Sequence, residues 1–252
     1  MIPKVIHYIW LGGNPLPKIV EKCIASWKKF CPDYEIKRWD ETNLDVNFCE
    51  FASQAYNARK FAFAADALRF DIIHKEGGIY LDIDVELFKS LDEVLDNNKV
   101  VMAFETENSV NPGLILAAEQ NNSTIKDILD IYLKDKFVLE DGSLNLETVC
   151  DKTTNYLVQY GLKLNNTNQK VSDVSVFATE YFCPKSLSDG KVRKTKNTMA
   201  IHHYFGSWIP KSSKFKGKVL QFIKRLMGPK LVAKLKEKRN KKDESSTSSC
   251  KQ

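Results

Sequence analysis

Residues 63–84, FAADALRFDIIHKEGGIYLDID, are the most informative stretch of this 252-residue chain. They follow a helical pattern rich in Ala, Phe and Leu that runs from about residue 57 to residue 75. Gly77 and Gly78 come next and are typical of a helix C-terminal cap. A buried strand is expected over 79–87. The stretch therefore predicts a helix, a glycine turn and an apolar strand that carries two aspartates.

Four charged side chains of this stretch are candidates for a ligand site. Strand alternation predicts that Asp82 and Asp84 share one face with Tyr80. Two carboxylates on an otherwise apolar face cost several kcal/mol unless a cation neutralises them, and Mg²⁺ or Mn²⁺ is typically held by one or two carboxylates plus substrate phosphates. Asp66 and Arg69 stand three residues apart, so they share a helix face. A lone D-x-D pair is a weak signal, and only the ordered combination predicts a ligand site at the end of a strand.

Strand and helix patterns alternate through about the first 105 residues. This alternation predicts an α/β fold with a mainly parallel central sheet. Strands are expected at 5–10, 34–39 and 99–104, with late strands at 175–183 and 199–204. Helices are expected at 19–30, 125–133 and 147–160.

Three blocks of the sequence resemble glycosyltransferase family 32, the group with a DxD-containing sugar-binding region that includes capsular-polysaccharide enzymes and yeast α-mannosyltransferases. The blocks are IPKVIHYIWLGG at 2–13, the stretch 63–84, and AIHHYFGSW at 200–208. The glucosyltransferase domains of the large clostridial toxins are more distantly similar. The resemblance implies a GT-A fold, which is a Rossmann-like nucleotide-sugar-binding domain. It also implies a nucleotide-sugar donor, a divalent metal (Mn²⁺ or Mg²⁺) and retention of anomeric configuration.

The resemblance also implies roles for individual residues. The expected catalytic groups are Asp66 and Arg69, which would hold the donor sugar and its phosphates, and Asp84, which would be the direct metal ligand. Asp82 would meet the ribose or the water shell of the metal. Trp10 would stack on the nucleotide base. The remaining expected donor-binding residues are Tyr80 at the nucleotide, Asn111 in a loop, and Ser207 with Trp208 closing over the donor.

A histidine of the third block is expected to complete the metal or diphosphate site. The spacing to Ser-Trp favours His202, whereas the His-Tyr-x-Gly pattern of related retaining transferases favours His203. Adjacent strand residues face opposite sides, so the two are not expected to bind the same metal. Both remain candidates at this stage.

The formal net charge of +6 hides an uneven distribution. Residues 211–252 hold 14 Lys/Arg and 3 Asp/Glu, so the rest of the chain is mildly acidic. We expect a catalytic domain over 1–210, a basic amphipathic helical segment over 211–239 and a disordered tail over 240–252. The middle segment is typical of an interfacial anchor on an anionic membrane, and the alternative is a helix packed on its own domain. Nucleic-acid binding is disfavoured because the apolar stripe lacks interleaved aromatic residues.

Composition also limits where the protein acts. No apolar run approaches the ~18–20 residues of a membrane span, and the N-terminal apolar run is too short for a signal peptide. The six cysteines show no metal-site or disulfide spacing. The expected location is therefore the cytoplasm, on the inner face of the cell membrane.

These patterns favour a retaining, metal-dependent glycosyltransferase that uses a nucleotide-sugar donor, with a UDP-sugar expected. Its acceptor would be a saccharide or lipid-linked oligosaccharide in bacterial surface or capsular polysaccharide assembly. Two alternatives stay open. One is a toxin-like transferase that modifies a protein hydroxyl, and the other is a non-catalytic module that binds sugar nucleotides.

Overall fold

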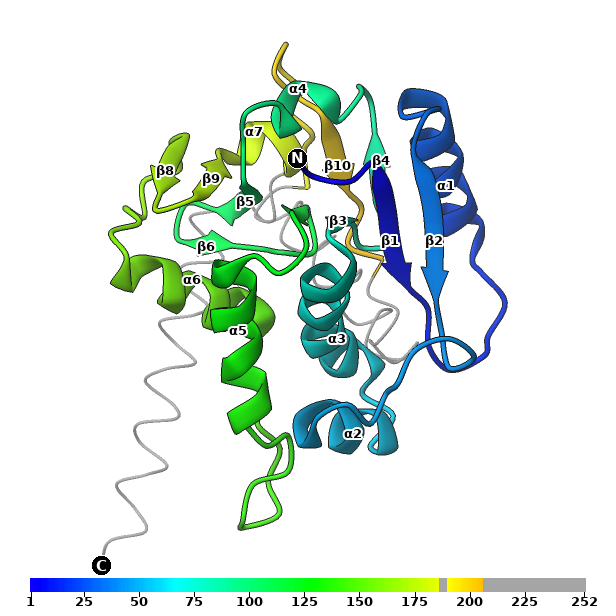
Figure 1. Ribbon diagram of the computed structural model, residues 1–252. Helices are drawn as coiled ribbons and strands as arrows, with labels where there is room; N and C mark the ends of the chain where they lie inside the picture. Colours follow the sequence, from blue (N-terminus) through cyan, green and yellow to red (C-terminus); the bar gives the residue numbers. More distant parts are fainter. Residues whose placement is uncertain (186–189, 206–252) are drawn as a thin grey trace, which may run out of the picture. The chain divides into compact units, whose positions relative to one another are not determined.

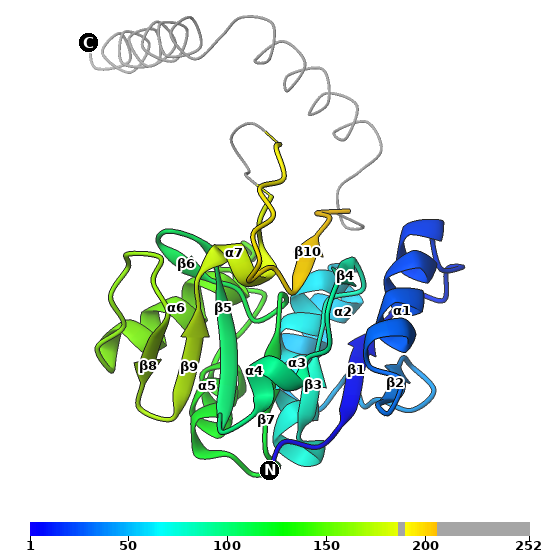
Figure 2. The ribbon, with the colours of Figure 1, turned by 90° about the horizontal axis from the view of Figure 1, so that it is seen from above.

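The structure is a computed structural model that describes residues 1–185 and 190–205. Its central sheet has eight strands in the order β2-β1-β3-β7-β5-β9-β8, with β6 paired to β5 (Figure 1). The strands of this sheet are β1 (Val5–Ile9), β2 (Glu35–Trp39), β3 (Gly78–Tyr80), β5 (Val100–Thr106), β6 (Ser109–Val110), β7 (Leu116–Ala118), β8 (Gln169–Val171) and β9 (Val174–Phe177). A second sheet pairs β4 (Val85–Leu87) with β10 (Ala200–His202), which lie side by side in Figure 2.

The central sheet is mainly parallel, as predicted. Strands β2, β1 and β3 pair in parallel, and so do β5 and β9. Strand β7 runs antiparallel between β3 and β5, so these two flanking strands also point the same way. Five strands therefore share one direction and bring their carboxyl ends to one edge, which is the edge where open α/β sheets bind ligands.

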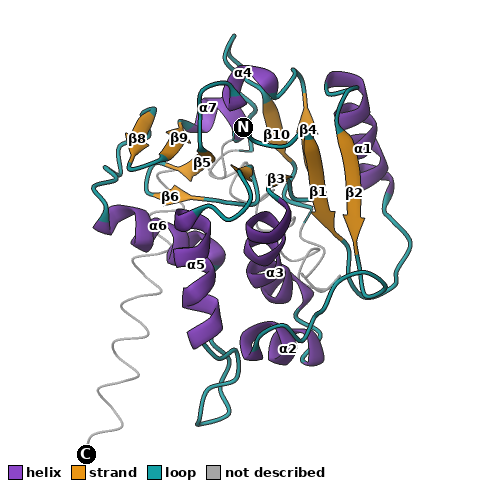
Figure 3. Cartoon of the chain, in the orientation of Figure 1, coloured by secondary structure: helices purple, strands orange, loops and turns teal. Residues whose placement is uncertain are grey.

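Helices cover both faces of the sheet (Figure 3). The alternation of side chains along β5 shows the division: Val100, Met102 and Phe104 pack into the core with α2, α3, α5 and α6, while Val101 and Ala103 pack into the core with α1, α4 and α7. The helices are α1 (Lys18–Phe30), α2 (Glu50–Asn57), α3 (Phe61–Glu76), α4 (Asp92–Leu95), α5 (Ser123–Lys134), α6 (Val149–Gln159) and α7 (Thr179–Phe182).

The glycine pair after α3 has the predicted capping role. The Gly77 N–H donates to the Ile73 carbonyl at 3.0 Å, and both glycines have positive φ, +66° and +92°. A Cβ on Gly78 would lie 2.8 Å from both His7 Nε2 and the Val5 carbonyl oxygen. Only glycine fits there without displacing β1, which pairs directly with β3. The turn therefore returns the chain from α3 straight into the centre of the sheet.

The strand expected over 79–87 is wrong as a continuous element. Strand β3 ends at Tyr80, and a turn closed by the Val85 N–H and the Asp82 carbonyl, 3.0 Å apart, leads into β4. The chain leaves the central sheet here because β4 pairs with β10 and not with β1 or β7. Asp82 and Asp84 consequently belong to a turn and not to one face of a strand.

Two other expectations need correction. The predicted strand over 175–183 ends at Phe177, and the rest forms the short helix α7. The predicted long helix from about residue 57 begins at Phe61, because Arg59 takes a left-handed conformation (φ +55°) between α2 and α3. The remaining expected helices and strands are present with boundaries shifted by a few residues. Among the described residues, no helix is long and apolar enough to cross a membrane.

His7 holds β1 to its neighbours as a buried, neutral imidazole. Its Nδ1 accepts the indole N–H of Trp39 at 3.0 Å, so its Nε2 carries the proton that it donates to the Gly77 carbonyl at 3.0 Å. Burial lowers the pKa of His7 from 6.5 to about 4, despite the hydrogen bond to Gly77. This histidine is therefore a structural residue.

The free energy of unfolding is expected to fall as the pH is lowered from 6.5 to 4. The folded pKa of His7 lies below the unfolded value, so the unfolded chain binds more protons in this interval, and the loss reaches roughly 3 kcal/mol when it is complete. Urea unfolding at pH 7, 5.5 and 4.5 measures it. The His7→Gln variant serves as the control and shows a shallower dependence; equal slopes for the two proteins would contradict the assignment.

Candidate active site

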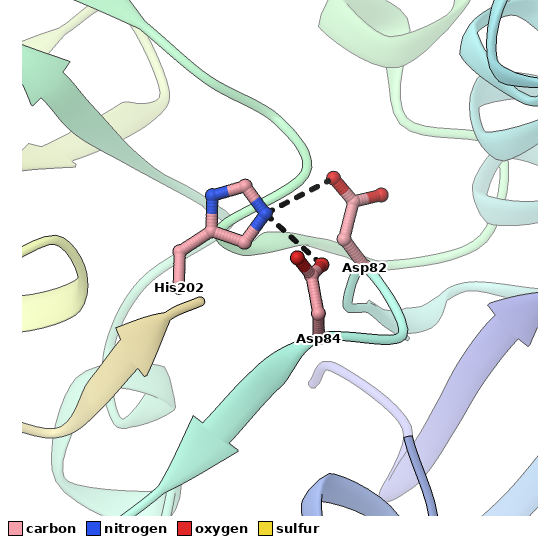
Figure 4. A group of neighbouring side chains, drawn as sticks. All are labelled: Asp82, Asp84 and His202. Atoms are coloured by element: carbon pink, nitrogen blue, oxygen red, sulfur yellow. Dashed lines mark hydrogen bonds and ion pairs between the residues drawn. The ribbon is translucent and has the colours of Figure 1, made fainter. Parts of the chain in front are cut away.

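The turn between β3 and β4 brings three potential metal ligands together. One ligand atom each of Asp82, Asp84 and His202 lies within 4.8 Å of the others (Figure 4). His202 Nε2 is 3.0 Å from Asp84 Oδ1 and 4.0 Å from Asp82 Oδ2. Asp84 and His202 are buried, whereas the side chain of Asp82 is 25% exposed. Asp84 is therefore the inner carboxylate of the group, and Asp82 is the one that solvent can reach.

Strand β10 places the histidine, although it lies 118 residues beyond Asp84 in sequence. His202 is paired with Val85 in the antiparallel register, which sets its side chain next to Asp84. The His203 N–H donates to the Asp84 carbonyl at 3.0 Å, and the Phe205 N–H donates to Asp84 Oδ2 at 2.7 Å. The last described residues of the chain therefore close around this carboxylate.

The structure separates the two candidate histidines. His203 Nε2 lies 2.8 Å from Glu86 Oε2, and the same oxygen accepts from Lys22 Nζ at 2.9 Å. Consecutive residues of β10 thus face different partners, as strand alternation requires. Only His202 lies beside the two aspartates.

Asp66 and Arg69 of α3 lie next to this turn. Arg69 Nη2 donates to Asp66 Oδ1 at 2.6 Å, and Arg69 Nη1 lies 3.5 Å from Asp82 Oδ1. The guanidinium carbon is 4.7 Å from the centre of the Tyr80 ring, and the Tyr80 hydroxyl donates to Asp82 Oδ1 at 3.1 Å. Arg69 is buried, and its Nη1 has no hydrogen-bond acceptor among the described residues. A buried cationic donor is thus left available for an anionic ligand.

Burial and pairing act against each other on the charges of the site. Burial raises the pKa of Asp84, but hydrogen bonds from His202 and from the Phe205 N–H outweigh this effect, so the pKa is lowered. Burial lowers the pKa of His202, and the hydrogen bond and charge of Asp84 reverse this and raise it. For Asp66, burial dominates over the charge of Arg69 and the pKa is raised. The pKa of Asp84 is therefore lowered, whereas that of Asp66 is raised.

The residues present fit a divalent metal ion. Two carboxylates and one imidazole form a hard oxygen and nitrogen donor set, which suits Mn²⁺ and Mg²⁺. Arg69 lies against Asp66 and Asp82, and the imidazole of His202 lies against Asp84. Figure 4 shows the three side chains pointing toward one another, so their ligand atoms converge on one place.

Of the other predicted site residues, one lies beside the aspartates, one is buried in the core, and two lie outside the described residues. Trp10 directly follows β1, but its ring is buried in the core and its indole N–H donates to the Asn14 carbonyl at 2.6 Å. Asn111 lies in the loop that runs beside Asp82. Ser207 and Trp208 lie outside the described residues, as do the segments expected at 211–239 and 240–252.

Gly113 is a site residue that the sequence analysis missed. Its carbonyl accepts the Asp82 N–H at 2.8 Å, and its own N–H donates to Asn111 Oδ1 at 2.6 Å. A Cβ at this position would lie 2.0 Å from Asp82 Oδ2. The sequence analysis placed Asn111 in a loop, but nothing in the sequence shows that this loop lies against the aspartates.

Comparisons with known proteins find glycosyltransferases. The family described as "Glycosyltransferase sugar-binding region containing DXD motif" matches residues 17–101. An uncharacterised glycosyltransferase of Acanthamoeba polyphaga mimivirus is 26% identical over 220 residues, which cover 83% of this chain and 85% of the viral protein. Inositol phosphoceramide mannosyltransferase 3 of Schizosaccharomyces pombe is 34% identical over 105 residues, 37% of this chain and 27% of that enzyme.

Among solved structures, the PaToxG glycosyltransferase aligns with a TM-score of 0.49 at 21% identity, over 63% of this chain and 69% of that one.

The protein is a glycosyltransferase. Residues 17–101 match the DXD-containing sugar-binding region of the family 32 type, and mannosyltransferases are among the similar proteins. The resemblance stated from the three sequence blocks is thereby confirmed. The chain spans only about a quarter to a third of the curated yeast mannosyltransferases that it matches.

The Gly113→Ala substitution is expected to weaken Mn²⁺ binding by about tenfold or more, because the new methyl group displaces the Asp82 carboxylate. The backbone of Gly113 does not have a positive φ, so alanine adds no backbone strain there. Calorimetric titration with Mn²⁺ in the presence of UDP measures the effect. Asp82→Asn provides the comparison, and a Gly113→Ala protein with unchanged Mn²⁺ affinity would show that the loop does not position Asp82.

Proposed function

We propose that the protein is a retaining, divalent-metal-dependent glycosyltransferase that transfers a sugar from a nucleotide-sugar donor, a UDP-sugar, to a saccharide or lipid-linked oligosaccharide acceptor. The observation that carries this proposal is the convergence of the Asp66–Arg69 pair with Asp82, Asp84 and His202. Retention and the choice of UDP rest on the family resemblance alone.

Loss of a nucleoside diphosphate is the step that this site must assist. Negative charge grows on the departing phosphate as the sugar gains positive charge, so fixed positive charge at the phosphate lowers the barrier. A divalent metal, when bound, would neutralise the diphosphate, with Asp84, Asp82 and His202 as its ligands. Arg69 would add a second positive charge through Nη1, which has no acceptor among the described residues.

The neighbours of Arg69 would hold it in place for this role. Asp66 accepts from Nη2, and the Ala65 carbonyl accepts from Nε at 3.3 Å, so two residues of α3 itself orient the guanidinium. The Tyr80 ring packs against its face. A group that is oriented before the substrate binds costs no reorganisation during the reaction.

A non-catalytic sugar-nucleotide module and a toxin-like transferase remain the alternatives. The module is disfavoured because gathering three carboxylates, of which Asp84 is buried, around a buried arginine costs stability, which a protein without catalysis need not bear. Profiling acceptors separates the transferases: a saccharide or lipid-linked saccharide supports this proposal, and a protein hydroxyl supports the toxin-like alternative.

Donor hydrolysis by the purified protein is expected with at least one of UDP-Glc, UDP-Gal, UDP-GlcNAc, UDP-GalNAc and GDP-Man, and it is expected to depend on Mn²⁺. Nucleotide release is measured for each donor with Mn²⁺ and with EDTA. The Asp84→Asn variant should lose activity on the order of a hundredfold or more, since it removes the buried carboxylate that lies beside His202. Asp96→Asn, at an exposed aspartate, is the matched control. Turnover that EDTA leaves unchanged would refute metal dependence.

The basic segment over 211–239 is proposed to place the enzyme on the inner face of the cell membrane, where surface or capsular polysaccharide is assembled. Support comes from the sequence: apolar residues recur at helical spacing among lysines and arginines. Each basic residue near an anionic surface contributes about 1 kcal/mol.

Deletion of residues 211–252 is expected to abolish co-sedimentation with vesicles containing 30% anionic lipid while the protein stays folded. Vesicles of neutral lipid are the control, because the binding is electrostatic and also weakens at high salt. Aggregation of the truncated protein would instead indicate that the apolar stripe packs on the catalytic domain.

A further inference from the structure

Glu105 lies at the carboxyl end of β5, the same edge of the sheet that carries the proposed active site. Its side chain is half-buried. Asn111 Nδ2 donates to Oε1 at 3.1 Å, and the Cys150 thiol lies 3.8 Å from Oε2. Neither the family resemblance nor the sequence patterns pointed to this residue.

Two short paths of contacts connect Glu105 to the proposed site. Through Asn111 it is linked to Gly113, whose backbone lies against the Asp82 carboxylate. Through Cys150 it is linked to the first turn of α6, where the preceding residue, Val149, provides a backbone hydrogen bond to Asp66. Glu105 therefore contacts both the loop that lies against Asp82 and the first turn of α6, which lies beside Asp66.

Glu105 lacks the kind of partner that the neighbouring carboxylates have among the described residues. Asp66 and Asp82 each lie beside Arg69, and Asp84 binds His202. Within residues 1–185 and 190–205, no lysine or arginine forms an ion pair with Glu105. Its negative charge contributes, after burial, to the raised pKa values of Cys150, Cys183 and Tyr204, and it adds to the effect of Asp84 and Asp82 in raising the pKa of His202. The neighbours of this half-buried carboxylate are an amide, a thiol and the Tyr204 hydroxyl, so its two oxygens keep unused hydrogen-bond acceptor capacity.

This combination selects the chemistry of the ligand. An unbalanced carboxylate repels phosphate, so it is unsuited to the diphosphate part of a nucleotide sugar. It is well suited to accept hydrogen bonds from the hydroxyl groups of a neutral sugar, and such bonds to a charged group are strong. Because the contacts of Glu105 lead both to the Asp82 loop and to the helix start beside Asp66, we expect the sugar that reaches it to be the one joined to the diphosphate.

We propose that Glu105 accepts hydrogen bonds from the hydroxyl groups of the transferred sugar and thereby helps to determine which donor sugar the enzyme uses. This inference rests on the proposed function, because it assumes that a nucleotide sugar binds at Asp66, Arg69 and the aspartate turn. Glu105 would select the sugar, and the other groups would bind the nucleotide diphosphate.

The test compares Glu105→Gln with the wild-type protein. Glutamine has the same shape and can still accept from Asn111, so the loop should stay in place, while the charge is lost. Glu105→Ala serves as a second variant. Glu107→Gln, at an exposed position two residues further along, is the matched control. Thermal unfolding shows that each variant is folded.

Three quantities are measured in the presence of Mn²⁺: the affinity for UDP, the affinity for the UDP-sugar that the wild-type protein hydrolyses, and the rate of hydrolysis of every donor in the panel. We expect Glu105→Gln to keep its UDP affinity within about twofold and to lose about tenfold or more in kcat/KM for the preferred donor. The differences in kcat/KM between the donor sugars should also become smaller. Glu107→Gln should match the wild-type protein in all three quantities.

The failures of the two proposals are distinguishable. Equal loss of UDP and UDP-sugar affinity would overturn the sugar assignment, because Glu105 would then support the nucleotide or metal site. If Glu105→Gln hydrolyses every donor as the wild-type protein does, the sugar assignment is overturned as well. This holds even if the variant transfers sugar to an acceptor more slowly. Absence of turnover by the wild-type protein with any donor would overturn the proposed function and this inference together.

Discussion

Mutual repulsion between closely spaced carboxylates is the constraint on which the site depends. Asp66, Asp82 and Asp84 are brought together from α3 and from the turn between β3 and β4, in surroundings that give little access to water. Such an arrangement is stable only if positive charge lies within a few ångströms of each carboxylate. Arg69 provides it for Asp66 and Asp82, whereas Asp84 has hydrogen bonds from His202 and from the Phe205 N–H. A divalent cation would strengthen the same balance.

The fold meets this constraint by assembling the site from distant parts of the chain. The glycine pair at 77–78 returns α3 directly into β3, so Arg69 and Asp82 can meet across the turn. Gly113 lets a separate loop pass against Asp82 without a side chain in the way. Strand β10 then brings His202 and the Phe205 N–H to Asp84. Each contribution works because a backbone approaches closely, and two of them require glycine.

The helix, the glycine cap and the two aspartates were predictable from the stretch 63–84 because they depend on interactions within a few residues. The parallel sheet was predictable for a related reason, since alternating strand and helix patterns allow few arrangements. The end of the strand at Tyr80 was not predictable, because an apolar run has the same pattern whether it stays in one sheet or passes from one sheet to another. The exchange of pairing partners from β1 to β10 is a long-range event.

The sequence by itself determined the class of the protein, the identity of the charged groups and the local elements that carry them. The tertiary structure decided which histidine lies beside the aspartates, and it brought Gly113 and Glu105 to the site. It also showed Trp10 to be a buried core residue with its N–H already bonded. The physical reason is the same in each case. Residue type and spacing set what a side chain can do, whereas its partners come from segments whose approach is determined only by packing of the whole sheet.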